Sequence, residues 1–176
     1  MKQMTNRKTA TKLLLVQWSR FQNVSMRLEG STLFTGVNTS GKSTILDAMT
    51  YLLTGNTQFN KAAKDRDRTV VAYVRGDTKS NGPERYLRTG EVVSYIVMEF
   101  WSPVEDASLV VGVCIESADE TSYRSSWFVC RDTAISQMNF TRTENGFLYI
   151  TPRNELAIDG RTLRSADFLG RDRGVE

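Results

Sequence analysis

A phosphate-binding loop is the feature of this sequence with the clearest chemistry. Residues 36–43 follow the pattern G-x-x-x-x-G-K-S, the spacing of a loop that wraps around a phosphate group. Gly36 and Gly41 carry no side chain, so the backbone there can turn tightly and come close to an anion. Lys42 would place a positive charge beside the β- and γ-phosphates, and the Ser43 hydroxyl would bind Mg²⁺. The pattern therefore predicts binding of a nucleotide with Mg²⁺.

The segments on either side of the loop are those that such a loop needs. An apolar stretch at residues 33–35 predicts a short strand that enters the loop, and apolar residues at helical spacing predict a helix over residues 43–53. Gly55 predicts the end of that helix. The first N–H groups of the helix would then point at the phosphate. A glycine-rich turn that precedes a helix by chance is the alternative, and this context argues against it.

The rest of the chain predicts short strands in hairpins. Residues 13–18 have the pattern of a buried strand, and residues 24–28 that of its half-exposed partner. Further strand patterns, separated by short turn signals, occur at residues 92–101, 108–117, 123–131 and 146–151. Strands this close in sequence pair antiparallel, because a parallel pair needs a long crossover. Residues 69–74 predict one more short strand, and residues 75–91 a mobile loop.

The predicted fold class is therefore α/β, a P-loop core with one main helix joined to a largely antiparallel β-sheet. At 176 residues, with 40% hydrophobic side chains, the chain can bury one core, and we expect a single domain over residues 1–176. Its expected parts are a P-loop core at 13–60, an arginine-rich loop region at 61–90 and an antiparallel β subdomain at 91–160.

Composition excludes several classes of protein. No apolar run approaches the length of a membrane span, and the first residues lack the apolar core of a secretory signal, so we expect a cytoplasmic location and no membrane partner. Cys114 and Cys130 lie in apolar strand patterns, which predicts buried thiols rather than a disulfide framework or a zinc site. The absence of histidine excludes histidine-based catalysis and histidine–metal sites.

Charge is segregated along the chain. Residues 1–46 carry seven basic groups against one acidic group, whereas residues 91–123 carry seven acidic groups and no basic one. A polyanion, either the nucleotide or a nucleic-acid backbone, would suit the basic part. An ordinary solvated surface would show the same composition, so charge alone leaves contact with DNA open.

The sequence lacks the acidic residues that a complete hydrolytic site needs. Such a site has an acid on the metal at the end of an apolar strand and a group that orients the attacking water. No apolar run here is followed by Asp-Glu, and Glu99 and Asp132 occur in strand patterns without that context. The chain thus predicts nucleotide binding with half of a catalytic site. The alternatives are a self-sufficient small P-loop kinase or NTPase that uses Glu99 or Asp132, and a non-hydrolysing nucleotide-sensing module.

The half site, the antiparallel sheet and the loop together resemble the N-terminal head segment of SMC-like, ABC-type ATPases. The blocks that carry the resemblance are LLLVQWSRF (13–21), TGVNTSGKSTILDAMTYLLTG (35–55), RDRTVVAYVRG (66–76) and YLRTGEVVSYIVMEF (86–100). The loop block is specific to the superfamily. The other blocks are most similar to the MukB/MksB/JetC branch, in which JetC belongs to the Wadjet plasmid-defence system.

This resemblance implies a longer protein, in which a coiled coil, a hinge and a C-terminal segment follow. The C-terminal half of the head would supply the Walker B acid, the catalytic glutamate and the signature motif. Two heads would sandwich ATP and Mg²⁺ between them, with kleisin-type and accessory subunits. The whole complex would act on DNA at the nucleoid.

The resemblance also implies roles for individual residues. Contacts to phosphate or Mg²⁺ would come from the loop residues Gly36, Asn38, Thr39, Ser40, Gly41, Lys42, Ser43 and Thr44. Gln22 and Asn23 would touch the nucleotide from the first hairpin, unless they are a plain turn. One arginine among Arg66, Arg68 and Arg75 would stabilise γ-phosphate charge or sense DNA, with surface solvation as the alternative. Thr39 stands where the family usually has glycine, and a positive φ there would cost about 1–3 kcal/mol.

Overall fold

The computed structural model describes residues 7–38, 40–59, 68–78, 80, 82 and 84–170. Within these residues the largest sheet has six antiparallel strands in the order β10-β5-β4-β3-β1-β2. The strands are β1 (Thr9–Trp18), β2 (Phe21–Arg27), β3 (Val92–Ser102), β4 (Ala107–Ser117), β5 (Arg124–Arg131) and β10 (Phe168–Gly170). The predicted antiparallel pairing is thus confirmed, and it places the first hairpin in the same sheet as β3 to β5.

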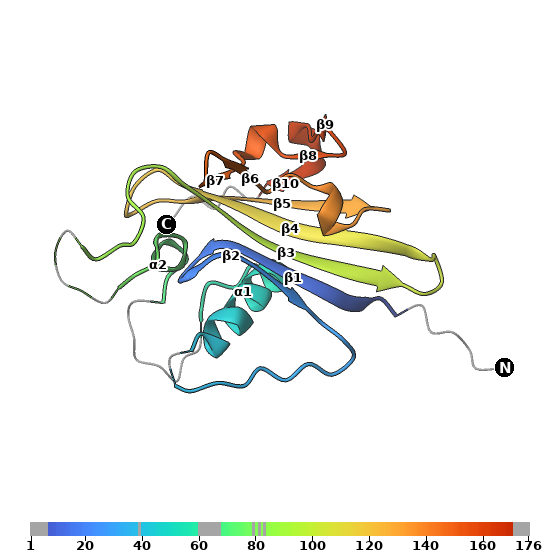
Figure 1. Ribbon diagram of the computed structural model, residues 1–176, viewed down its shortest axis with the longest axis horizontal. Coiled ribbons are helices and arrows are strands. Elements are labelled where there is room, and N and C mark those ends of the chain that lie inside the picture. Colours follow the sequence, from blue (N-terminus) through green and yellow to red (C-terminus); the bar gives the residue numbers. More distant parts are fainter. Residues whose placement is uncertain are drawn as a thin grey trace.

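The sheet is covered on both faces (Figure 1). One face packs against helix α1 (Lys42–Thr54) and the short helix α2 (Val70–Arg75). The other face carries two small hairpins, β6 (Thr141–Glu144) with β7 (Phe147–Ile150) and β8 (Ala157–Ile158) with β9 (Arg161–Thr162). Single turns of 3-10 helix complete this second layer: η1 (Ile135–Gln137), η2 (Arg153–Glu155) and η3 (Ser165–Asp167). No described helix is long and apolar enough to cross a membrane.

Strand β1 contributes to both layers, because successive strand residues point to opposite faces. Leu15 is buried on the α1 face, whereas Leu14 and Val16 are buried in the second layer. Gln17 interrupts this alternation with a left-handed φ of 50°. Beyond it Trp18 lies on the α1 face, although an unbroken alternation would place it on the same face as Leu14 and Val16. This reversal brings a large aromatic ring beneath the first turn of α1.

Two predicted strands are absent. Residues 33–35 pair with no strand in the described part of the chain, and the Leu33 side chain is 83% exposed. An extended segment needs a neighbour for its backbone groups to become a strand. Residues 69–74 form α2 instead, because the Thr69 side chain accepts the Ala72 N–H and Gly76 ends the helix with a φ of 71°. Capping therefore outweighs the strand propensity of the β-branched residues.

The predicted mobile loop at residues 75–91 is held by hydrogen bonds wherever it is described. The Leu87 N–H donates to Gly76 O at 3.0 Å, and the Arg88 N–H donates to Arg75 O at 3.0 Å. The side chains of Arg75 and Arg88 also donate to backbone carbonyls, and Arg75 is only 1% exposed. The turn-forming composition of this segment could not predict these hydrogen bonds, because several of the partners lie far away in the sequence.

Cys114 and Cys130 are buried free thiols, as predicted. Burial raises the pKa of Cys114 to about 12, and it raises the pKa of Cys130 above the ordinary value. Because the thiolate is the reactive form, we expect the native chain at about pH 8 to react with DTNB at least about tenfold more slowly than the urea-unfolded chain. Rapid titration of both thiols in the native chain would contradict this burial.

Candidate functional site

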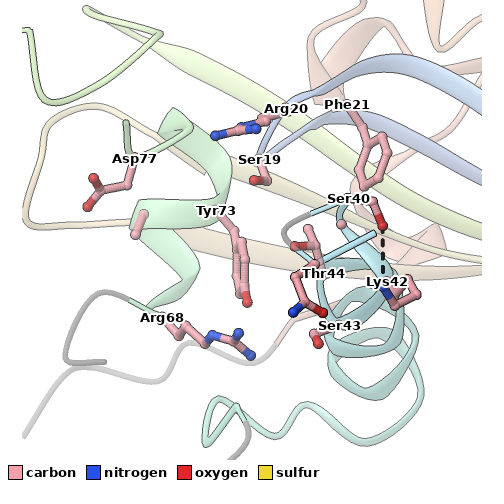
Figure 2. A pocket seen from close by; sticks show the side chains of 13 residues that line it. Ser19, Arg20, Phe21, Ser40, Lys42, Ser43, Thr44, Arg68, Tyr73 and Asp77 are labelled. Carbon is pink, nitrogen blue, oxygen red and sulfur yellow. Dashed lines mark hydrogen bonds between the residues drawn. The ribbon is translucent and has the colours of Figure 1, made fainter. Parts of the chain in front are cut away.

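A pocket of about 630 Å³ lies where the predicted phosphate loop, the turn between β1 and β2, and α2 come together (Figure 2). The residues that line it are Ser19, Arg20 and Phe21 from the turn, Asn38, Ser40, Gly41, Lys42, Ser43 and Thr44 from the loop and α1, and Arg68, Ala72, Tyr73 and Asp77 from α2 and its flanks. Three segments that are distant in sequence thus build one cavity. The lining includes the basic residues Arg20, Lys42 and Arg68 and the N-terminus of α1, a combination suited to an anionic ligand.

Close packing explains why the loop carries glycine at two positions. Gly41 has a φ of 99°, and a β-carbon there would lie 3.0 Å from Phe21 Cζ. Gly36 has a φ of 155°, and a β-carbon there would lie 2.6 Å from Ser40 Oγ. Both conformations are costly for residues with side chains. The ring of Phe21 therefore leaves no room for a side chain at position 41, and Ser40 leaves none at position 36.

Helix α1 begins without a side-chain cap. Gly41 precedes it and makes no side-chain cap hydrogen bond, and its first turn holds no acidic residue. The N–H groups of the first turn and the positive end of the helix dipole make this terminus a favourable place for a phosphate.

Lys42 lies across the mouth of the loop. Its Nζ donates to the carbonyls of Gly36 at 2.6 Å and Val37 at 2.9 Å, with Ser40 Oγ at 3.5 Å (Figure 2). A phosphate oxygen is a charged acceptor and so a stronger partner for an ammonium group than a carbonyl. The geometry therefore fits a lysine that turns from the loop carbonyls to a bound phosphate.

The donor set also fits Mg²⁺. Ser43 is exposed in the first turn of α1, and its hydroxyl is the oxygen donor that this hard cation prefers. Among the described residues no group of three His, Cys, Asp or Glu side chains could hold a metal ion. A Mg²⁺ ion here would therefore be held by Ser43 together with phosphate oxygens and water.

The two tryptophans on the helix face of the sheet fix α1 in place. The indole N–H of Trp18 donates to Thr44 O at 3.0 Å, and that of Trp127 donates to Leu52 O at 3.1 Å. Trp18 is fully buried, so its ring packs in the core and is not available to stack on a base. Because α1 is hydrogen-bonded near both of its ends, the position where the phosphate loop joins the helix is fixed.

The turn between β1 and β2 is joined to α2. The Ser19 N–H donates to Tyr73 O at 2.5 Å, and Arg88 donates to Ser19 O and Val74 O, both at 2.9 Å. Burial lowers the pKa of Arg88, and neutral carbonyls are its partners. This guanidinium therefore keeps two walls of the pocket together.

The structure brings some of the predicted ligand-binding residues together and leaves others apart. The pocket is lined by Asn38, Ser40, Gly41, Lys42, Ser43 and Thr44 of the predicted set. Gln22 and Asn23 do not line it, and the Asn23 amide donates instead to Thr141 Oγ1 in the second layer at 3.2 Å. Thr39 and Arg66 lie outside the described residues, so the predicted strain at Thr39 stays a prediction.

Of the candidate arginines that the structure describes, one lines the pocket and the other is buried elsewhere. Arg68 lines the pocket, and its side chain extends toward the loop (Figure 2). Arg75 is buried away from the pocket, so its assignment to γ-phosphate is not supported by its position. It donates to Ser117 Oγ and to the carbonyls of Arg88, Gly90, Ser117 and Asp119.

The two acids of the self-sufficient alternative do not reach the pocket. Glu99 lies on the second-layer face of β3, where its carboxylate accepts the Ile135 N–H at 2.8 Å and the Thr11 hydroxyl at 3.3 Å. Asp132 is exposed in the turn after β5. Neither residue lines the pocket, so the structure does not support either of them as its catalytic acid.

Sequence reasoning missed the residues that come from outside the loop. Ser19 and Arg20 form a short turn, Tyr73 lies on a helix predicted as a strand, and Asp77 follows that helix. One signal was present in the sequence. Asp47 stands between apolar residues on the inner side of α1, and such a buried charge requires a partner.

A family model described as the P-loop containing region of an AAA domain matches residues 10–66. This span holds β1, β2, the phosphate loop and α1, about a third of the chain. No curated protein matches the chain. The match and the geometry of the loop support a P-loop NTPase, and the pocket beside the loop is the candidate site for its nucleotide.

Proposed function

We propose that this chain is the ATP-binding N-terminal lobe of an SMC-like, ABC-type ATPase head of the MukB/MksB/JetC kind. The observation that carries the proposal is the composition of the pocket. Lys42, Arg68 and the start of α1 can hold a triphosphate, and Ser43 can hold Mg²⁺. Among the described residues that line the pocket, Asp77 is the one carboxylate, and it accepts from Arg85 at 3.1 Å. The pocket is thus equipped for binding and needs a second segment for hydrolysis.

The surface around the loop supports a partner segment. Leu33 is 83% exposed and Val37 80%, and Leu46 and Leu53 project from the outer side of α1 at more than half exposure. Figure 1 shows the connection between β2 and α1 passing on the side of the helix away from the sheet. Exposed apolar side chains on this connection and on the exposed side of α1 are suited to contact with a partner. In the proposal, the C-terminal half of the head covers this region and pairs with residues 33–35.

The wider role rests on the four sequence blocks and on the basic N-terminal part of the chain. In the proposal, ATP joins two heads, kleisin-type and accessory subunits complete the complex, and its substrate is DNA at the nucleoid of the cytoplasm. A plasmid-defence role of the Wadjet type belongs to the same proposal.

Complementation tests the proposed half site. We expect the chain alone to bind Mg·ATP in calorimetry without measurable phosphate release, and to hydrolyse ATP when a C-terminal head segment with a Walker B acid and signature motif is added. Steady hydrolysis by the chain alone, abolished by Lys42→Ala, would contradict the half site. Binding without turnover, even with the added segment, would favour a nucleotide-sensing module instead.

A further inference from the structure

We propose that Asp47 is a positioning residue that sets the preference of the pocket for a triphosphate over a diphosphate. Its carboxylate fastens Tyr73 and Arg68 to α1, so that the Arg68 guanidinium faces the terminal phosphate. This inference rests on the proposed nucleotide binding and deepens it, because it names the groups that recognise the end of the phosphate chain.

Asp47 is a buried charge on the helix that carries the loop. It is 8% exposed and lies one helical turn after Ser43, the residue placed to bind Mg²⁺. Burying a carboxylate is costly unless it is paired and hydrogen-bonded. Here one oxygen, Oδ2, accepts the Tyr73 hydroxyl and lies 3.5 Å from Arg68 NH1. Both partners line the pocket, so this carboxylate links the phosphate loop to the opposite wall.

Tyr73 is held in place by contacts of its ring, its carbonyl and its hydroxyl. Its ring stacks on Trp18 with centroids 4.6 Å apart and planes 28° from parallel, and its carbonyl accepts the Ser19 N–H. Burial, and then the hydrogen bond to Asp47, raise the pKa of the Tyr73 hydroxyl well above its ordinary value. The hydroxyl therefore stays protonated and donates to the carboxylate. Through Tyr73, Asp47 fixes the separation of α1 from α2 and from the β1–β2 turn.

Arg68 is the cation that Asp47 positions. Its side chain is 27% exposed, and in Figure 2 it reaches toward the loop at the Ser43 end of the pocket, whereas Arg20 lies at the other end. The contact with Asp47 engages NH1, and a guanidinium carries donors on three nitrogens. The side chain can therefore bind Asp47 and a phosphate oxygen at the same time. A Mg²⁺ ion held at Ser43 would keep the β- and γ-phosphates at the Ser43 end of the pocket, so the phosphate within reach of Arg68 would be the terminal one.

Asp47 could either strengthen or weaken the binding of ATP, and the two possibilities predict opposite effects of removing its charge. If Asp47 competed with the phosphate for Arg68, removing its charge would tighten ATP binding. If Asp47 positions Arg68, removing the charge weakens ATP binding and leaves ADP binding alone. The geometry favours positioning, because the Tyr73 bond holds the carboxylate and Arg68 meets it at one nitrogen only at long range.

The test measures the dissociation constants of Mg·ATP and Mg·ADP for the full chain by calorimetry. Asp47→Asn keeps the size of the side chain and an acceptor for Tyr73. We expect it to weaken ATP binding about tenfold and to change ADP binding less than about twofold, because a charge-assisted contact to the terminal phosphate is lost. Arg68→Ala should give the same pattern. In the double variant the two losses should not add, because Asp47 acts through Arg68.

Glu99→Gln is the matched control, since Glu99 is another buried carboxylate but lies in the second layer. It should leave the ATP-to-ADP ratio unchanged. Should Asp47→Asn fail to fold, Tyr73→Phe keeps the ring on Trp18 and should weaken ATP about threefold with ADP unchanged.

Three results would overturn the proposal: equal weakening of ATP and ADP, tighter ATP binding, or additive losses in the double variant. A wild-type chain that bound neither nucleotide would overturn the proposed function together with this inference. A wild-type chain that bound ATP, with an unaltered ratio in the Asp47 and Tyr73 variants, would overturn this inference alone.

Discussion

Replacing Lys42 with alanine is expected to weaken Mg·ATP binding by at least about 100-fold, the largest effect on ligand binding that the structure predicts. Lys42 Nζ is held within the loop by the carbonyls of Gly36 and Val37, at the place where the β- and γ-phosphates would bind. Alanine leaves the backbone N–H groups of the loop and of α1 in place. Residual binding should therefore come from those groups, and it should be weak for ATP and ADP alike.

Lys8→Ala is the control for the loss of one positive charge. Lys8 precedes β1 and pairs with Glu105 in the turn between β3 and β4, it does not line the pocket, and a surface ion pair of this kind contributes little to stability. We expect Lys8→Ala to bind ATP as the wild type does, and both variants to melt within a few degrees of it. Equal losses of affinity in the two variants would mean that ATP is attracted by overall charge, and the loop would then not be the binding site.

The features that could be predicted from the sequence are those set by local rules. Glycine spacing marked the loop, helical periodicity marked α1, and Gly55 does end that helix, with a φ of 67°. Alternation of apolar residues marked the strands of the main sheet. Each of these signals lies within about a dozen residues, so no knowledge of the fold was needed.

The remaining walls of the pocket depend on tertiary contacts. Tyr73 lies opposite Asp47 only because α2 is a helix, and α2 is a helix because one threonine caps a run of β-branched residues. Ser19 and Arg20 reach the site because the turn between β1 and β2 bonds to that helix. Apart from the charged Asp47 between apolar residues of α1, which requires a partner without naming it, none of these contacts has a signature in the spacing of the sequence. Residues 33–35 show the converse, since their strand pattern has no partner in the described residues.

Arg75 illustrates how a motif can mislead about function. It belongs to the arginine-rich block at residues 66–76, which predicted a role at the γ-phosphate, yet it is 1% exposed and donates to a hydroxyl and to backbone carbonyls from two loops. The residues before β3 and after β4 both close on this guanidinium. Its removal leaves several buried carbonyls without donors, and each unsatisfied group costs about 1–3 kcal/mol.

Arg75→Met, which keeps an unbranched stem but removes every donor, is therefore expected to lower the free energy of unfolding by about 3–5 kcal/mol. Urea denaturation followed by tryptophan fluorescence measures this loss. Arg68→Met is the comparison, and we expect it to cost less than about 1 kcal/mol, because Arg68 is partly exposed and makes one long contact to Asp47. An Arg75→Met chain of unchanged stability that had lost ATP binding would reverse the two assignments. The expected pattern, with stability lost at Arg75 and triphosphate preference lost at Arg68, separates the arginine that builds the fold from the arginine that serves the site.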